Sequence, residues 1–152
     1  MRIDELKKWN EEAPNDTDIL GHYWMSRKII NYFEVENGKP LETDERNCLI
    51  LTPEENGKTR FEFTLIGNNV DVCEMAGVAT FKGSYYEFKP TDTGDTDAPK
   101  DCMLHIKIRK NSIMLSDIDN ACYWHFCGNH AVINGTEFSR KQRSDDCYEG
   151  KN

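Results

Sequence analysis

The sequence predicts an all-β protein, an antiparallel meander that forms a small barrel or a sandwich. Two observations predict it: apolar and polar residues alternate in short runs, and Gly and Asn turn residues separate these runs. Alternation with a period of two buries one face of each strand, and short strands at this spacing are typical of barrels and sandwiches. A chain of this length builds one core, so we expect a single domain over residues 1–152, with a β core over about residues 20–140.

The first segment has a different period. Ile3, Leu6 and Trp9 form a partial apolar stripe of helical spacing, and Pro14 ends it. Acidic residues in the first turn favour a helix start. We therefore expect a short N-terminal helix over residues 3–13.

Alternating runs predict the strands that follow. Residues 21–40 end in an Asn37-Gly38 turn, and although the centre of this stretch could form a short helix, its aromatic and β-branched residues favour a strand. The later strands are expected around residues 48–51, 61–65, 70–72 and 78, 86–88, 104–108, 113–115 and 131–133. Turn residues at 67–69, 82–83, 110–111 and 134–135 separate them, and residues 141–152 are expected to form a tail.

The charge of the chain limits its partners. There are 27 acidic and 19 basic side chains, which gives a net charge of −8 and a pI of about 5.0. Such a field repels nucleic-acid phosphates and anionic lipid headgroups. No stretch approaches the ~20 apolar residues of a membrane span. We expect no nucleic-acid partner and no membrane insertion.

The cysteines indicate the compartment. An even number in a small polar domain favours an oxidising environment, where thiols pair as disulfides. The six are Cys48, Cys73, Cys102, Cys122, Cys127 and Cys147. We expect three disulfides, no free thiol, and a periplasmic or secreted protein whose signal peptide is not included in this sequence.

Residues 122–135, CYWHFCGNHAVING, hold the densest group of reactive side chains. Cys122, His125, Cys127 and His130 are residue types that bind zinc, but structural zinc sites pair two close ligands with two distant ones. In a strand, moreover, Cys127 and His130 would point to opposite faces. We favour disulfides, and expect no metal and no cofactor.

A catalytic thiol is disfavoured by the same stretch. A nucleophilic cysteine needs an electropositive, partly exposed setting, whereas this loop follows Asp117 and Asp119 in an acidic chain. The sequence also contains no phosphate-binding loop, zinc-protease helix or serine-hydrolase elbow. We expect a protein that is not an enzyme.

Four consecutive rings, residues 123–126, lie between two cysteines of this loop. Consecutive residues of a regular structure point in different directions, so the rings cannot all face one core. They either anchor a partner, because rigid aromatics lose little entropy on binding, or cover an open barrel end. Both interpretations remain open at this stage.

Acidic residues flank the loop or lie at the same end of the expected meander. Residues 91–101 lack the ligand order of the common calcium loop, so a solvated hairpin loop is favoured over a calcium site. Acidic side chains steer a basic partner by raising its association rate. The expected binding site has Tyr123, Trp124 and His125 as anchors and Asp92, Asp95, Asp97, Asp117 and Asp119 as an acidic rim.

Several spaced motifs carry a resemblance to known proteins. They are Gly21-x-Tyr23, the Leu49 to Pro53 run LILTP, Phe61-x-Phe63-x-Leu65-x-Gly67, Cys73-x-Met75-x-Gly77-x-Ala79, Cys102-x-Leu104-x-Ile106 and the closing pattern DxxxxCxxxxCGxxAxxxG from Asp117 to Gly135. In this order they resemble a group of small uncharacterised bacterial exported proteins over roughly residues 20–140. His130 stands where that group usually has a basic residue. The acidic, cysteine-linked layout is more loosely similar to periplasmic lysozyme inhibitors and toxin-immunity proteins.

The resemblance implies export, a compact β fold and disulfides. That group generally has only four of these cysteines, which leaves Cys48 and Cys147 as the expected additional pair. Among the other four, a Cys102–Cys122 bond would bridge the open end of the hairpin that turns at residues 110–111, leaving Cys73–Cys127. A Cys122–Cys127 bond within the aromatic loop is the alternative.

Two functions are consistent with these observations. The first is an exported, non-enzymatic binding protein, an inhibitor or immunity protein that caps a basic secreted hydrolase or toxin. The second is a carrier of a lipid or another small hydrophobic molecule in the barrel mouth. An apolar cavity of several hundred Å³, on the order of known ligand pockets, would favour the carrier.

Overall fold

A computed structural model of the chain describes residues 19–94 and 96–147. The expected helix over residues 3–13, Asp95 and residues 148–152 lie outside this part. Within it, no helix is long and apolar enough to cross a membrane.

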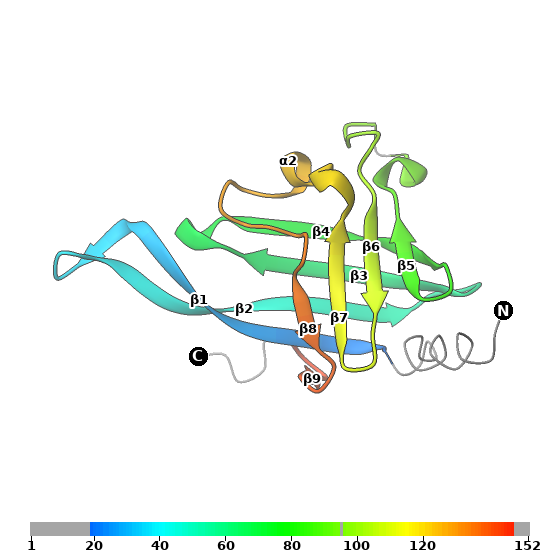
Figure 1. Cartoon of the computed structure of the whole chain (residues 1–152), viewed down its shortest axis with the longest axis horizontal. Helices are drawn as coiled ribbons and strands as arrows, with labels where there is room; N and C mark the ends of the chain where they lie inside the picture. Colours follow the sequence, from blue (N-terminus) through cyan, green and yellow to red (C-terminus); the bar gives the residue numbers. More distant parts are fainter. Residues whose placement is uncertain (1–18, 95, 148–152) are drawn as a thin grey trace.

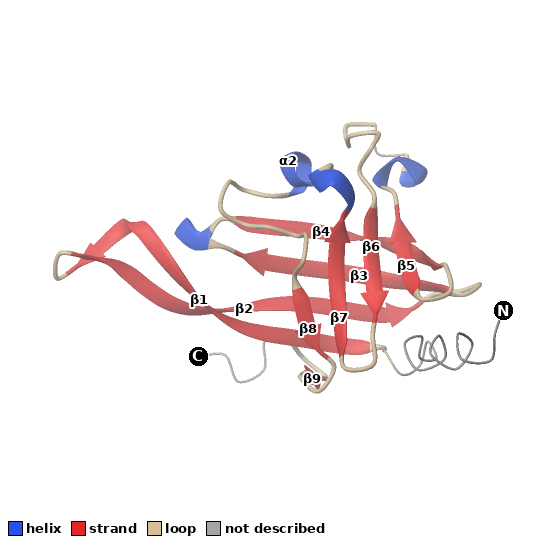
Figure 2. Cartoon of the chain, in the orientation of Figure 1, coloured by secondary structure: helices blue, strands red, loops and turns tan. Residues whose placement is uncertain are grey.

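The described residues form one antiparallel sheet of nine strands that curls into a nearly closed barrel (Figure 1). The strands are β1 (Gly21–Glu36), β2 (Lys39–Pro53), β3 (Lys58–Ile66), β4 (Val72–Phe81), β5 (Tyr85–Phe88), β6 (Leu104–Ile108), β7 (Ser112–Asp117), β8 (Glu137–Ser139) and β9 (Arg143–Ser144). From β1 to β8, each strand pairs with the next one along the chain, which confirms the predicted meander. The helical segments are short (Figure 2): η2 (Asn68–Val70), η3 (Pro90–Thr93), η4 (Ile118–Asn120) and α2 (Tyr123–Phe126).

The two ends of the meander are joined by the last strand. β8 pairs with β7, and after a short turn β9 pairs with β1 through His22 and Tyr23. The Trp24 N–H also donates to the Gln142 carbonyl over 3.2 Å. Residues beyond 140, expected as a tail, therefore include the strand that brings the sheet edges together. A barrel, rather than a sandwich, results.

Strand alternation builds the core. In β3, Phe61, Phe63 and Leu65 are buried while the residues between them face outward. The Phe61 ring meets the Phe88 ring edge to face, with centroids 4.9 Å apart. Gly77 leaves room for this contact, because a Cβ there would lie 2.3 Å from the Phe88 ring.

The predicted Asn37-Gly38 turn closes the longest hairpin. Both residues have positive φ, 54° and 77°, as a two-residue turn of this type requires. β3 pairs with β2 only over residues 48–53, so β1 and β2 continue together past it. Ile29 and Asn47 of this ribbon are still buried, and the part nearer the turn projects. Figure 1 shows this projecting ribbon, which we call the β1–β2 arm and define as residues 25–47.

The prediction of a strand at residues 131–133 is wrong. Ala131 and Ile133 are buried and Val132 is exposed, so the alternation is present, but these residues form a loop. The edge of β7 is instead paired by Glu137–Ser139. Alternation alone cannot distinguish a strand from an extended loop that lies on the core.

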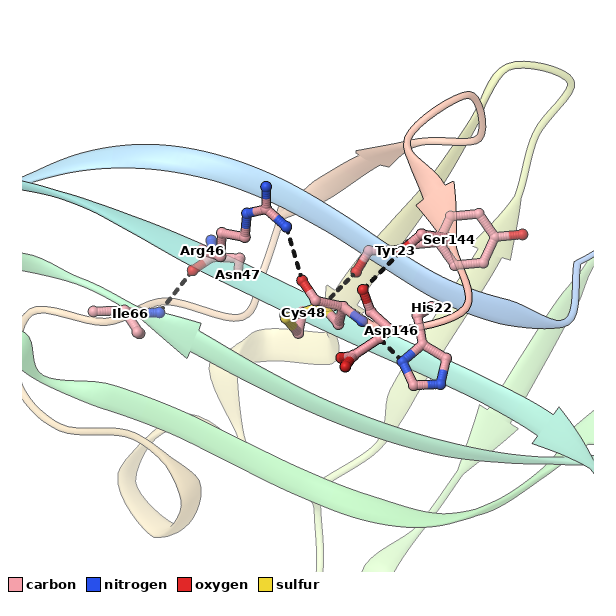
Figure 3. Close-up of a disulfide and its surroundings, with 9 residues drawn as sticks. His22, Tyr23, Arg46, Asn47, Cys48, Ile66, Ser144 and Asp146 are labelled. Carbon is pink, nitrogen blue, oxygen red and sulfur yellow. Dashed lines mark hydrogen bonds between the residues drawn. A yellow bond between two sulfur atoms is a disulfide. The ribbon is translucent and has the colours of Figure 1, made fainter. Parts of the chain in front are cut away.

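A disulfide between Cys48 and Cys147 fastens the segment that follows β9 to the barrel (Figure 3). Cys48 of β2 and Cys147 are bonded and buried, with their Cα atoms 5.9 Å apart. The Cys147 N–H donates to His22 Nδ1 over 3.1 Å, and the Arg46 guanidinium donates to the Cys147 carbonyl over 3.1 Å. The Arg46 guanidinium also lies 4.2 Å from the Trp24 ring centroid. The segment around Cys147 is thus held by a disulfide and two hydrogen bonds, and the Arg46 side chain that donates one of them is itself held over the Trp24 ring.

Candidate functional site

The candidate binding loop lies at one end of the barrel. Phe88 pairs with Leu104, and Leu104 pairs with Asp117, so the end of β5, the start of β6 and the end of β7 lie side by side. The segments 89–103 and 118–136 both emerge at this end, where Figure 1 shows α2. The topology therefore brings the aromatic loop and the acidic loop to the same end, as the sequence predicted.

Two disulfides bound the aromatic loop. Cys102–Cys122 fastens its first end to the segment before β6, and Cys73–Cys127 fastens its second end to β4. The Cα atoms of the two pairs are 4.5 Å and 4.0 Å apart, respectively. This confirms the favoured pairing and shows that the Cys122–Cys127 alternative is wrong. With Cys48–Cys147, all six cysteines of the chain are paired.

The disulfides decide the chemistry of Cys122 and Cys127. Their sulfur atoms are bonded to other sulfurs, so neither is a thiolate that could bind zinc or attack a substrate. Among residues 19–94 and 96–147, no group of three or more His, Cys, Asp or Glu side chains is placed to hold a metal ion.

Between the two disulfides, the helix α2 spreads its four rings in different directions. Trp124 is 80% exposed and His125 is exposed, whereas Phe126 packs partly against the core. Tyr123 is half-buried, and its hydroxyl donates to the Asn129 carbonyl over 2.7 Å. The Tyr123 ring meets the Trp124 ring edge to face at 5.0 Å. Trp124 is therefore presented to solvent and does not plug the barrel.

Asp117, the last residue of β7, supports this loop. It is 2% exposed, and its carboxylate accepts hydrogen bonds from the backbone N–H groups of Cys122, at 2.9 Å, and Tyr123. Burial raises the pKa of the Asp117 carboxyl above its ordinary value, although the two backbone bonds lower it. The Asp117 N–H in turn donates to Asn134 Oδ1 over 3.1 Å. Asp117 was expected on the acidic rim, and its burial places it inside the fold instead, because the N–H groups of the turn need an acceptor there.

The remaining rim residues lie at the surface where they are described. Asp119 is exposed in η4, Asp92 is exposed in η3, and Asp97 is exposed in the loop before β6. Asp95 is outside the described residues. Of the five residues predicted for the acidic rim, Asp92, Asp97 and Asp119 are therefore the ones at the surface.

A second support of the loop was not predicted from the sequence. The Asp71 carboxylate accepts a hydrogen bond from the His130 N–H over 3.0 Å and also contacts the His130 ring Nδ1. A Cβ at Gly67 would lie 1.9 Å from the His130 carbonyl oxygen, so the loop lies directly on this turn. The only signal in the sequence was the position of Asp71 two residues before Cys73. That spacing indicates a neighbour of the loop only once the Cys73–Cys127 bond is known.

Core side chains occupy the barrel interior. Tyr23, Phe61, Phe63, Tyr86 and Phe138 are among the largest, and each is at most 2% exposed. They pack in one cluster with the aliphatic residues of β6 and β7. The candidate site is accordingly an outer surface, formed by a loop at the barrel end.

No protein-family model, curated protein or solved structure matches this chain.

Proposed function

We propose that this is an exported, non-enzymatic binding protein, an inhibitor or immunity protein that caps a basic secreted hydrolase or toxin with its aromatic loop. One observation carries the proposal. Trp124 is 80% exposed on a four-residue helix whose two flanking cysteines are each bonded to a different strand or loop of the barrel.

A fixed, exposed tryptophan is well suited to bind a partner. Tryptophan is among the residues most enriched in interface hot spots, where a few anchors carry most of the binding energy. A loop that is already ordered loses little conformational entropy when it docks. Two disulfides and the Asp117 and Asp71 hydrogen bonds supply that order here.

The charge of the chain supports a basic partner. The net charge is −8, and Asp92, Asp97 and Asp119 are exposed at the end of the barrel that carries the loop. Complementary charge mainly increases the association rate, while the aromatic anchors slow dissociation. We infer that the rim steers a cationic protein toward Trp124.

The three disulfides indicate an oxidising environment, because such bonds persist outside the reducing cytosol. Within that environment, we propose a periplasmic or secreted location, where wall- and lipid-degrading hydrolases act.

The carrier alternative has weaker support. Ligand carriers enclose a mostly apolar cavity. Here large side chains occupy the barrel interior, and a hollow of about 490 Å³ between β1 and the segment before β8 is lined in part by Arg27, Asn47 and Glu137. A surface of this kind suits a protein partner better than a lipid.

The test is a titration of the purified protein against a panel of cationic wall-degrading hydrolases and lipases, read as loss of hydrolase activity and as binding kinetics. We expect stoichiometric inhibition of at least one member. Trp124→Ala should raise its Kd about 30-fold or more, chiefly by faster dissociation. Val132→Ala is the matched control, because Val132 is 49% exposed in the same loop but outside α2.

The acidic rim is tested on the same partner. Asp92→Asn combined with Asp97→Asn should slow association and flatten its salt dependence, with little change in dissociation. Absence of binding across the panel, or equal losses for Trp124→Ala and Val132→Ala, would contradict the proposal.

A further inference from the structure

The end of the barrel opposite the candidate binding loop is basic. Leu104 pairs with Asp117 at the loop end of the β6–β7 hairpin, and Ile108 pairs with Ile113 at the other end, so the turn at residues 109–111 lies away from α2. Figure 1 shows this turn and the β8–β9 turn together at the bottom of the view, with α2 at the top. The two turns and the strand ends beside them carry six of the 19 basic side chains, a set that we call the basic end: Lys107, Arg109, Lys110, Arg140, Lys141 and Arg143.

Hydrogen bonds hold the two turns against each other. The Arg140 N–H donates to the Asn111 carbonyl over 3.0 Å. The Arg140 guanidinium donates to the carbonyls of Arg109 and Lys110 over 2.9 Å and 3.4 Å, respectively. The basic side chains therefore belong to one continuous surface and not to two separate tips.

The positive charge is not compensated within these turns. Residues 107–112 and 138–144 contain no Asp or Glu. Among the described residues, no ion pair engages four of the six side chains, Lys107, Arg109, Lys110 and Lys141. Three of these four are exposed, and Lys107 is half-buried. They are available to an anionic partner.

A small hollow opens beside this surface, where β5 begins and β6 ends. It has a volume of about 170 Å³ and is lined by Ser84, Tyr85, Lys107, Ile108 and Arg109. Two of these side chains are cationic, two carry hydroxyl groups, and none is acidic. The backbone holds Ser84 in place, since the Ile108 N–H donates to the Ser84 carbonyl over 3.3 Å. A phosphate group is bound by charge-assisted hydrogen bonds from side chains of these kinds.

The basic end is far enough from the acidic residues to act separately. The net charge of −8 predicts repulsion from anionic lipid headgroups, but it averages over the whole surface. β6 has five residues at ~3.3 Å each, so about 17 Å separate the basic end from the end that carries Asp92, Asp97 and Asp119. The screening length is about 8 Å at physiological ionic strength. The positive charges therefore dominate the field close to this surface.

The composition of the basic end favours a membrane over a nucleic acid. Clusters of about four to eight Lys or Arg are typical of surfaces that dock on anionic lipid headgroups. Residues 109–112 and 139–144 contain no aromatic residue that could stack on an exposed base. The three disulfides indicate an oxidising environment, outside the compartment that holds most nucleic acid.

We propose that the basic end is a docking surface for a membrane that carries anionic phospholipids, with a headgroup phosphate in the hollow between Ser84 and Arg109. The docked protein lies on the membrane surface without an inserted segment. In this orientation the Trp124 loop, at the opposite end of the barrel, faces away from the membrane. The proposal is independent of the partner proposed for that loop.

Sedimentation of the purified, oxidised chain with phospholipid vesicles tests the proposal. At low ionic strength, we expect binding to phosphatidylcholine vesicles that contain phosphatidylglycerol to be at least ~10-fold stronger than to pure phosphatidylcholine. About 1 M salt, which shortens the screening length to about 3 Å, should abolish the difference. Equal binding to the two kinds of vesicle, or no binding to the anionic one, would overturn the proposal.

Charge removal at the basic end locates the contact. The triple variant Arg109→Gln, Lys110→Gln, Lys141→Gln should bind anionic vesicles on the order of 100-fold more weakly, since each Lys or Arg near the surface contributes ~5-fold. These side chains are exposed, so the variant should fold, as its unfolding curve will verify.

A matched triple variant separates local charge from net charge. Lys28→Gln, Lys39→Gln, Lys100→Gln changes the net charge by the same amount at exposed positions in the β1–β2 arm and in the loop before β6. It should weaken vesicle binding by less than ~3-fold. Equal losses for the two triple variants would show that binding follows net charge, which contradicts docking through the basic end.

Single substitutions test the headgroup site. Lys107→Gln and Lys110→Gln each remove one charge, but of these two only Lys107 lines the hollow. Lys107→Gln should therefore cost at least ~3-fold more in vesicle affinity, because it also removes charge-assisted hydrogen bonds to the phosphate. Equal losses would contradict a headgroup in the hollow.

Two further measurements test the orientation and the choice of partner. Trp124→Ala should leave vesicle binding unchanged, because the loop faces away from the membrane. A weaker affinity of this variant would show instead that the aromatic loop contacts lipid. Duplex DNA is the competing polyanion, and binding to DNA that is tighter than binding to anionic vesicles at the same salt concentration would reject the membrane as the partner.

Discussion

Asp117 and Cys122 are joined across the base of the aromatic loop, where the Cys122 N–H donates to the buried Asp117 carboxylate over 2.9 Å. One side chain thus holds the first turn of the loop at the point where the Cys102–Cys122 disulfide enters it. The bond connects the end of β7 to the segment that presents Trp124.

Two substitutions of Asp117 should separate what its hydrogen bonds contribute to stability from what its charge contributes. Asp117→Ala leaves the Cys122 and Tyr123 N–H groups without their acceptor and should cost ~1–3 kcal/mol of unfolding free energy. Asp117→Asn keeps an acceptor oxygen without the buried charge and should cost clearly less. Urea unfolding of the two variants makes the comparison. Equal losses would mean that the charge, and not the acceptor, is required.

The raised pKa of Asp117 predicts a pH dependence of stability. Because the folded state holds the Asp117 proton to a higher pH than the unfolded state, whose ordinary pKa is 3.8, the folded state binds more protons between the two values. The contribution of this carboxyl to stability is therefore greatest below pH 3.8 and decreases as the pH rises through the raised pKa.

The difference in unfolding free energy between the wild type and Asp117→Asn isolates this effect, because the other carboxyl groups cancel. The wild type should lose stability relative to Asp117→Asn as the pH rises from 3.8 through the raised pKa of Asp117. A difference that is flat with pH, or that moves in favour of the wild type, would contradict the assigned direction of the pKa.

The three disulfides should rank by the length of chain that they close. Their sequence separations are 99 for Cys48–Cys147, 54 for Cys73–Cys127 and 20 for Cys102–Cys122. The chain-entropy relation predicts that double serine variants lose about 5, 4 and 3 kcal/mol, respectively. Guanidinium unfolding measures the order. A largest loss for Cys102–Cys122 would show that support of the loop outweighs chain entropy.

Residues 32–34 of β1 have no pairing partner on β2 and form a bulge. Asn69 should hold this bulge in place by two separate effects. It has φ 59° and accepts the Tyr32 N–H, so Asn69→Ala loses the hydrogen bond and adds ~1–2 kcal/mol of left-handed strain. Asn69→Gly loses the bond without the strain. Hydrogen exchange at the Tyr32 amide should become faster in both variants, while global stability should decrease more for Ala. Unchanged exchange in both would show that Asn69 does not protect the bulge.

Gly77 should tolerate no side chain while Phe88 is present. A Cβ there would lie 2.3 Å from the Phe88 ring, so Gly77→Ala should cost ~1–3 kcal/mol from overpacking. Combining it with Phe88→Leu should recover part of that loss, and a double-mutant cycle by thermal unfolding measures the coupling. Strict additivity would mean that the two positions do not compete for space.

The sequence predicted best where a local pattern decides the structure. Phe61, Phe63 and Leu65 alternate with polar neighbours, and Asn37-Gly38 has the backbone freedom that a two-residue turn needs. These features depend on residues within a few positions of each other, so periodicity and turn chemistry were sufficient. The same logic predicted that the four consecutive rings at 123–126 cannot share one face, but it left open whether they anchor a partner or cover the barrel, and only the structure shows that Trp124 is exposed.

Prediction failed where a distant residue decides the outcome. Asp117 is buried because the chain turns back over it and offers N–H groups, which its charge alone does not indicate. The bulge at Phe33 depends on Asn68 and Asn69, which are almost forty residues away in the chain. The apolar residues 131–133 lack a strand because Glu137–Ser139 occupies the edge of β7.

The closure of the barrel by β9 also orders the events of folding. Tyr23 and Arg143 pair across 120 positions, so this edge of β1 stays unpaired until Arg143 has been synthesised. At ~5–20 residues per second, the 99 positions between Cys48 and Cys147 take on the order of 5–20 s to emerge. During that interval the Cys48 thiol is available while Cys73, Cys102, Cys122 and Cys127 appear one after another. Correct oxidation therefore requires either that the Cys48 thiol stays reduced until Cys147 appears or that an early mispaired bond is exchanged by another thiolate.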